Sequence, residues 1–237
     1  MKKNMLFLLA LIGALTFGSC KKSDKSYTCA TCTSTPRAAA ANDASSKGVY
    51  IGVLIGSSGT IKFDVMNNGT DITAVMVIDG VTVNLTSSVT WVSGQPYIAP
   101  FTGTLNGSPV SITFSVDNNG GSPTITTASV PGHPSIEFTL VKETSTALVE
   151  GFEGTYSTSQ NEKGTFNILL SRVLGKWGGV ARENGTTVSD DINGTIVNGK
   201  IIDDNNTQVG TLSGDEINGT FVDGNNTTIT IYGKRTL

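Results

Sequence analysis

The stretch Asn193-Gly194-Thr195-Ile196-Val197-Asn198-Gly199 returns further along the chain as Asn218-Gly219-Thr220-Phe221-Val222-Asp223-Gly224. Each copy is a short run rich in β-branched and aromatic residues that ends in Asn-Gly or Asp-Gly. These dipeptides tolerate the positive φ of a tight hairpin turn, so such a run leads directly into an antiparallel neighbour. The repeat therefore predicts β-hairpins.

The same pattern extends over the whole chain from Val49 onward. Short alternating runs are bounded by Gly, Asn and Asp, as at Asn67-Asn68-Gly69 and Asp79-Gly80, and no stretch has the pattern of a capped amphipathic helix. We predict an all-β, antiparallel meander in two consecutive β-rich units, residues 48–143 and 150–237, joined at residues 142–150. One continuous sheet through the joint is the alternative.

A meander of about eight strands must curl to close its edges or leave them open. We therefore expect each unit to be a small up-and-down barrel or a curved sheet. Closure is the preferred prediction, and a curved open sheet with solvent on one face is an alternative in the second unit, where apolar positions are few around residues 190–206. In style the pattern resembles small eight-stranded barrels of the avidin type and barrel-bearing surface lipoproteins of Gram-negative bacteria.

The first 19 residues have the features of an export signal. A basic start with Lys2 and Lys3 precedes an apolar run of about 13 residues, which is shorter than a membrane-spanning helix needs. Phe17-Gly18-Ser19-Cys20 resembles the lipobox of bacterial lipoproteins, with Phe17 in place of the usual aliphatic residue. The resemblance implies that Cys20 is acylated, for example with palmitate, and that the protein is anchored in the outer membrane, because Lys21 rather than Asp follows the cysteine.

Residues 20–47 contain several basic residues and few large apolar ones, a composition that predicts a flexible tether. Cys29 and Cys32 lie within it. The oxidising compartment implied by the export signal favours a disulfide between them, and free or intermolecular thiols are the alternative. A zinc site would need two further ligands, and the single histidine, His133, lies far away in the sequence.

Net charge and local sequence argue against nucleic-acid binding and against hydrolytic catalysis. A formal net charge of -3 supplies no basic face for nucleic acid. His133 stands in the turn Pro131-Gly132-His133-Pro134, an unsuitable place for the base of a hydrolytic triad. The carboxylate pairs Asp190-Asp191, Asp203-Asp204 and Asp215-Glu216 fall at expected turns, where adjacent side chains need not converge.

Two acidic loops and one pair of aromatic residues are candidate binding sites. Calcium is the most credible metal, at residues 203–206 and 223–226, but neither loop has the ligand spacing of a known calcium motif, and we assign no metal or cofactor. Trp91 and Tyr97 flank the loop at residues 93–96 and are candidate ligand contacts, although core packing is the default role of such side chains.

Together these observations predict a lipid-anchored cell-envelope protein that works by binding or as part of the surface, without catalysis. Its partners would be the membrane, through the anchor, and a carbohydrate or protein ligand on either the periplasmic or the outer face. The alternatives are a barrel that carries a small apolar molecule, a carbohydrate-active enzyme using Asp190, Asp203 and Glu216, and a structural spacer.

The acylation of Cys20 is directly testable. We expect the mature protein to fractionate with membranes and its N-terminal peptide to carry the mass of the acyl chains, because several chains together hold a protein stably in a bilayer. The Cys20→Ser variant should lose both properties. A wild-type protein with a bare thiol in the soluble fraction would contradict the prediction.

Overall fold

The computed structural model describes residues 26–237, so Cys20 and the export signal lie outside the described part of the chain. The first unit comprises β1 (Gly48–Ile55), β2 (Gly59–Val65), β3 (Ile72–Ile78), β4 (Val81–Thr86), β5 (Tyr97–Leu105), β6 (Ser108–Val116), β7 (Thr124–Ser129) and β8 (Glu137–Glu143). The second comprises β9 (Glu150–Thr158), β10 (Lys163–Ser171), β11 (Lys176–Glu183), β12 (Ser189–Val197), β13 (Lys200–Asp203), β14 (Gln208–Ser213), β15 (Glu216–Val222) and β16 (Thr228–Arg235). Within the described residues, one 3-10 turn, η1 (Ala40–Asn42), precedes them.

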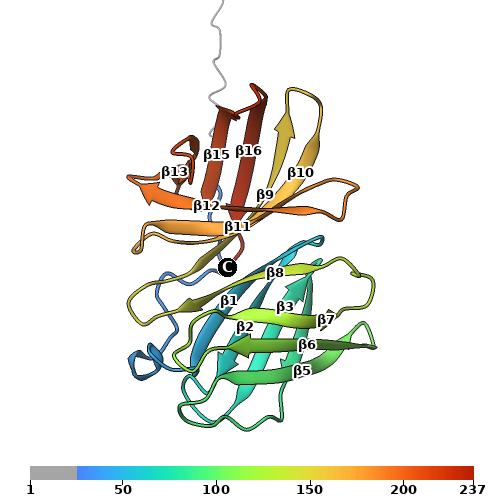
Figure 1. Ribbon diagram of the computed structural model, residues 1–237, viewed down its shortest axis with the longest axis vertical. Coiled ribbons are helices and arrows are strands. Elements are labelled where there is room, and N and C mark those ends of the chain that lie inside the picture. The colour runs from blue at the N-terminus through green and yellow to red at the C-terminus, as the bar shows by residue number, and fades with distance from the viewer. Residues whose placement is uncertain (1–25) are drawn as a thin grey trace, which may run out of the picture.

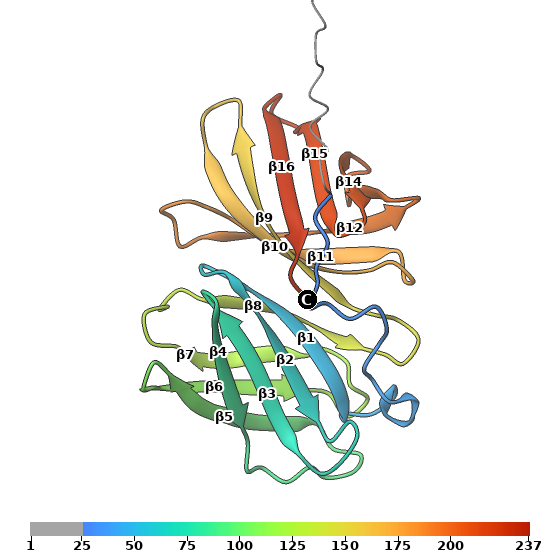
Figure 2. The same ribbon diagram turned by 180° about the vertical axis from the view of Figure 1, so that it is seen from behind.

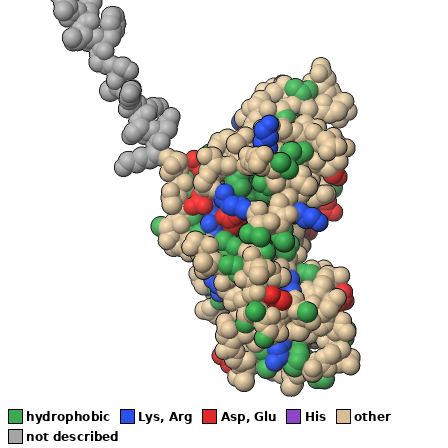
Figure 3. All heavy atoms as spheres, turned by 90° about the vertical axis from the view of Figure 1, so that its left-hand side faces the viewer, with side chains coloured by type: hydrophobic (Ala, Val, Ile, Leu, Met, Phe, Trp, Pro, Cys, Tyr) green, Lys and Arg blue, Asp and Glu red, His purple; other side chains and the backbone are tan. Residues whose placement is uncertain are grey.

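The strands confirm the prediction of an all-β antiparallel chain with two consecutive units (Figure 1). The units form two lobes stacked along the long axis of the molecule (Figure 3). Among the described residues there is no helix long and apolar enough to cross a membrane.

The first unit is a nearly closed sheet whose interior is filled. Its strands follow the order β7-β6-β5-β4-β3-β2-β1-β8, with β7 and β8 as edges that approach each other without pairing. The ring of Phe63 stacks on Phe114 at 4.6 Å between centroids, and Phe101 meets Phe63 edge-on at 4.9 Å. Tyr50 adds a fourth ring at 5.0 Å from Phe114, and all four residues are fully buried. Aromatic rings therefore occupy the centre of this unit.

The second unit is a closed barrel, because β16 pairs with β9 and completes the ring of eight strands. The alternative of an open sheet in this unit is therefore wrong. Glycines permit the tight curvature. A Cβ atom at Gly154 would overlap the ring of Phe166, and one at Gly194 or Gly219 would strike the backbone of the neighbouring strand.

Strand β1 joins the two units because it is buried on both faces along its whole length. Tyr50 and Leu54 point into the core of the first unit. Val49, Ile51 and Val53 point the other way and pack against Val149 and Leu169 at the foot of the second unit, with Ala38 and Leu237 at the margin. Figure 2 shows β1 and β8 on the side of the first unit that faces the barrel.

Polar contacts reinforce this junction. The amide Nδ2 of Asn167 on β10 donates to the carbonyl of Leu54, and both groups are buried. The guanidinium of Arg182 on β11 donates to the carbonyl of Ser135 at 2.8 Å and to the carboxylate of Glu137 at 2.9 Å. The Arg182 side chain is only 6% exposed, whereas Glu137 is 48% exposed, so the buried guanidinium reaches a carboxylate at the edge of the junction and helps to hold the barrel against the first unit.

Residues 26–47, here named the N-terminal strap, run along both units where the composition predicted a flexible tether. The hydroxyl of Tyr27 donates to the carbonyl of Arg235 at 2.8 Å, and the amide of Cys29 donates to Asp215 at 2.9 Å. Further along, the amide of Arg37 donates to the buried carboxylate of Glu143 at 2.6 Å. Buried backbone groups need such partners, so the strap has defined positions on the surface.

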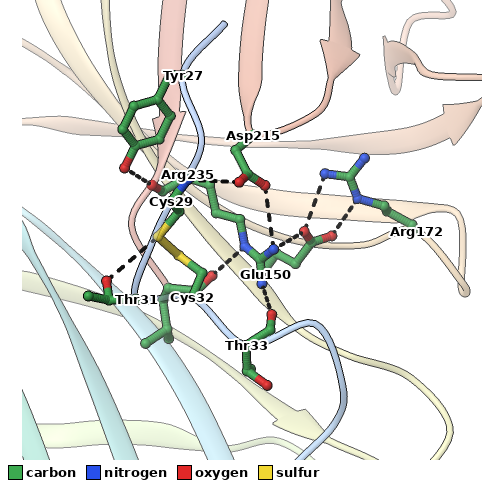
Figure 4. The surroundings of a disulfide bond; sticks show 10 residues. Tyr27, Cys29, Thr31, Cys32, Thr33, Glu150, Arg172, Asp215 and Arg235 are labelled. Carbon is green, nitrogen blue, oxygen red and sulfur yellow. Dashed lines mark hydrogen bonds and ion pairs between the residues drawn. A yellow bond between two sulfur atoms is a disulfide. The ribbon is translucent and has the colours of Figure 1, made fainter.

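A disulfide joins Cys29 to Cys32 within the strap, with their Cα atoms 5.4 Å apart (Figure 4). It lies beside a charge network centred on Glu150, a side chain that is only 4% exposed. Glu150 accepts from Arg172 at 2.7 Å and lies 3.0 Å from Arg235. Arg235 also donates to the carbonyl of Thr33 and thereby connects the barrel to the strap.

This network predicts unequal effects of its two arginines on stability. The Arg235 side chain is 8% exposed, so Arg235→Ala removes the buried cation beside Glu150 together with the donor to the carbonyl of Thr33, and it should lower the free energy of unfolding by about 3 kcal/mol. The Arg172 side chain is 43% exposed and shares the same carboxylate, so Arg172→Ala should cost less than about 1 kcal/mol. Urea unfolding of both variants checks this, and equal losses would contradict it.

Candidate functional site

The interior of the second unit contains a cavity of about 710 Å³. Its lining includes Gln160, Asn205 and Asn225, which lie in the β9–β10, β13–β14 and β15–β16 hairpin loops. The cavity therefore opens at the end of the barrel that carries these loops. In Figure 1 the β9–β10 and β15–β16 hairpins point away from the first unit.

The wall of the cavity is apolar because strand alternation turns every second side chain inward. The deepest lining side chains are buried: Phe166, Ile168, Trp177, Ile201 and Ile217. Nearer the mouth the lining is half-buried: Tyr156, Ala181, Ile192, Phe221, Ile229 and Ile231. The indole nitrogen of Trp177 donates to the carbonyl of Ile202 at 3.0 Å, so the ring can present an apolar surface without an unsatisfied polar atom.

The mouth of the cavity is acidic. Six of the lining residues carry carboxylates: Glu162, Asp190, Asp191, Asp203, Asp204 and Asp223. No lysine, arginine or histidine is among the lining residues. The barrel thus combines an apolar interior with an entrance whose charged lining residues are all negative.

Two of these aspartates build the loops in which they stand. Oδ1 of Asp203 accepts from the amides of Asn205 at 3.0 Å and Thr207 at 2.7 Å. Asp223 makes the same pair of bonds in the β15–β16 loop, to Asn225 at 2.9 Å and Thr227 at 2.8 Å. In the β9–β10 loop the hydroxyl of Thr158 takes the place of the aspartate. These carboxylates therefore have a structural role in Asx turns.

The carboxylates considered for glycoside hydrolysis do not converge. Asp190 and Asp203 line the mouth, whereas Glu216 is absent from the cavity lining and accepts from the hydroxyl of Tyr232 at 2.8 Å. Asp215 contacts Arg235 and the strap at the opposite end of the barrel. Within residues 26–237 no group of three or more His, Cys, Asp and Glu side chains has an arrangement that could hold a metal ion.

Trp91 and Tyr97, the two predicted ligand contacts, pack within the first unit. Tyr97 is 2% exposed, and its hydroxyl donates to the carbonyl of Val89 at 3.1 Å. The indole nitrogen of Trp91 donates to Ser46 at 2.8 Å, while the ammonium of Lys47 lies 4.2 Å from the ring centroid. Neither aromatic residue lines the barrel cavity, so the structure gives both a role in fastening the loop between β4 and β5.

His133 has two neighbours that the sequence did not reveal. Its Nδ1 lies 2.9 Å from Oγ of Ser57, and its Nε2 lies 3.8 Å from Asp79. Ser57 also contacts Asp79 directly at 2.8 Å, and because a carboxylate only accepts, the single hydroxyl proton points to Asp79. In a hydrolytic triad the histidine separates the hydroxyl from the carboxylate and removes that proton. This cluster instead ties the β1–β2 turn to the loop before β8.

A second cavity, of about 540 Å³, lies between the units. The β1–β2 turn covers it on one side, and the outer faces of β9, β10 and β16 form the other, with Glu153, Thr165 and Lys234 among the lining residues. Burial raises the pKa of Glu153 above its ordinary value, although hydrogen bonds with Thr236 and the backbone of Gly59 act in the opposite direction.

Comparison with known proteins adds no functional information. No family model, no curated protein and no solved structure matches this chain. The resemblance to avidin-type barrels therefore concerns the style of the fold alone. Any inference about function therefore rests on the geometry of the cavities.

The buried carboxyl of Glu153 predicts a specific pH dependence. Its pKa is raised on folding, so at neutral pH folding must bury a charge, and below the ordinary glutamate pKa this cost disappears. We expect Glu153→Gln to raise the free energy of unfolding at pH 7, with an advantage over the wild type that shrinks as the pH falls to about 3.5. Urea unfolding at several pH values measures this. The exposed Asp71→Asn variant controls for removal of one negative charge, and a pH-independent gain in Glu153→Gln would contradict the prediction.

Proposed function

We propose that this chain is a cell-envelope binding protein whose second unit holds a small molecule with an apolar body. The observation that carries the proposal is the apolar cavity of about 710 Å³ inside a closed barrel that is open at one end. Small-molecule sites are usually apolar cavities of about 300–1,000 Å³ with a few polar groups placed at one side. Eight strands enclose just enough space for one small ligand when the interior is left unfilled.

The contrast with the first unit supports this assignment. Both units have eight strands, but the rings of Phe63, Phe101 and Phe114 occupy the first interior. In the second unit the side chain of Ala181 is small, and positions 179 and 194 hold glycines because a Cβ there would strike the backbone of the neighbouring strand, so neither position sends a side chain into the interior. These small residues leave space that a packed core would fill. The first unit is therefore assigned a supporting role and the second the binding role.

The proposed location rests on the lipobox resemblance at Cys20. A lipid anchor would keep the barrel at a membrane, where apolar and amphiphilic molecules accumulate. In this setting the protein would capture or store such a molecule without changing it. A hydrolytic function has less support, since the Ser57, His133 and Asp79 side chains lack the arrangement of a triad.

A variant that fills the cavity tests the proposal. N-phenyl-1-naphthylamine, an uncharged fluorescent probe, should bind the wild type saturably and accept excitation energy from Trp177 in the cavity wall. Ala181→Phe places a ring in this space and should weaken binding at least tenfold, as should Ile192→Phe nearer the mouth.

The matched control is Thr230→Phe, which adds a ring to an exposed position on the outer face of β16 and should bind the probe like the wild type. Circular dichroism and urea unfolding establish that each variant is folded. Probe binding that is absent in the wild type, or equal in all folded variants, would refute the proposed function.

A further inference from the structure

We infer that the molecule held in the barrel is a cationic amphiphile, with its apolar tail in the cavity and its positive group at the mouth. The inference rests on the proposed function of the same cavity and specifies the chemical class of the ligand. It follows from how apolar and charged groups are distributed along the barrel axis.

The lining changes from apolar to acidic along this axis. Ile168, Trp177 and Ile217 are buried in the depth of the cavity, whereas Asp190, on β12, and Asp204, in the β13–β14 loop, are exposed at its mouth. A molecule that follows this gradient must place its apolar part inward and its polar part at the entrance. An apolar molecule without a head group would leave these carboxylates to water and gain nothing from their charge.

Asp190 is available to such a head group, because it alternates inward with Ile192 along β12, and Asp191 adds its charge at the rim. Asp203 and Asp223 use Oδ1 to accept backbone amides of their own loops. Asp190 and Asp191 have no such role: they lie on β12, opposite Ala181 and Val180 of β11, and make no ion pair within the described part of the chain. Within residues 26–237, no cationic side chain neutralises their charges.

The nearest arginine on the adjoining strand does not compensate for these charges. Arg182 lies opposite Ser189 on β12, but its guanidinium leaves the barrel and binds Glu137 and the carbonyl of Ser135 in the first unit. Carboxylates around an apolar opening produce a field of one sign, which attracts cations and repels anions. The mouth therefore discriminates by charge among molecules whose tails fit equally well.

Three probes of equal chain length test the inference: decyltrimethylammonium, decyl maltoside and decyl sulfate, each below its micellar concentration. Their ability to displace N-phenyl-1-naphthylamine gives their relative affinities. At low salt we expect the cation to bind at least tenfold more tightly than the anion and several-fold more tightly than the neutral probe. This preference should decrease as salt screens the carboxylates.

The double variant Asp190→Asn/Asp191→Asn should lose most of the preference for the cation and keep the affinity for the neutral probe. The matched control is Asp71→Asn/Asp117→Asn, which removes the same charge from exposed positions of the first unit and should leave the preference unchanged. An equal effect of both double variants would assign the preference to net charge and overturn the inference.

The outcomes separate this inference from the proposed function. Binding of all three probes with equal affinity would leave the barrel as a binding site and overturn the cationic preference. Displacement of the naphthylamine by calcium chloride as effectively as by decyltrimethylammonium would also overturn it, because the mouth would then be a metal site. Failure of every probe, the naphthylamine included, would refute the proposed function itself.

Discussion

The two-sided burial of β1 is the constraint on which the architecture depends. An antiparallel strand usually turns one face to a core and the other to water, but every residue of β1 is buried. Each face requires a separate apolar partner, and the two units supply one each. Separation of the units would expose Val49, Ile51 and Val53 to water, at a cost of roughly 1.5–3 kcal/mol for each large side chain. The barrel is thus positioned by the same strand that opens the meander of the first unit.

Equal numbers of strands lead to different interiors in the two units because the inward residues differ in volume. Phe63, Phe101 and Phe114 meet at the centre of the first unit, where their edge-on and stacked contacts leave little room. In the barrel, Phe166 extends over the inward glycines Gly154 and Gly233 and fills one side only. Which of these interiors a sequence produces depends on strand register, since a shift by one residue exchanges the inward and outward sets.

The antiparallel hairpins and the succession of two β-rich units could be predicted from the sequence, because turn residues such as Asn198-Gly199 mark hairpins locally. The course of the strap was not predictable, since it depends on partners distant in sequence, such as Glu143 for Arg37. The continuous apolar run of β1 was a signal for burial on both faces. Asp203-Asp204 stands at the β13–β14 turn, as expected, whereas the expectation of a turn at Asp190-Asp191 was wrong, because both residues lie within β12. Only the closed barrel shows that these carboxylates stand at one entrance.

With Cys20 acylated, as proposed, the contacts of the strap would also limit the distance between the barrel and the membrane. If residues 20–47 were a free tether, as their composition predicts, they would span at most about 100 Å at roughly 3.5 Å per residue. Tyr27 is already held against the barrel through the carbonyl of Arg235, so seven residues remain from the proposed acylated Cys20, or about 25 Å. A connection of this length would keep the barrel within a thin layer next to the bilayer. A guest leaving the lipid would then meet it at a high effective concentration, with little opportunity to diffuse away.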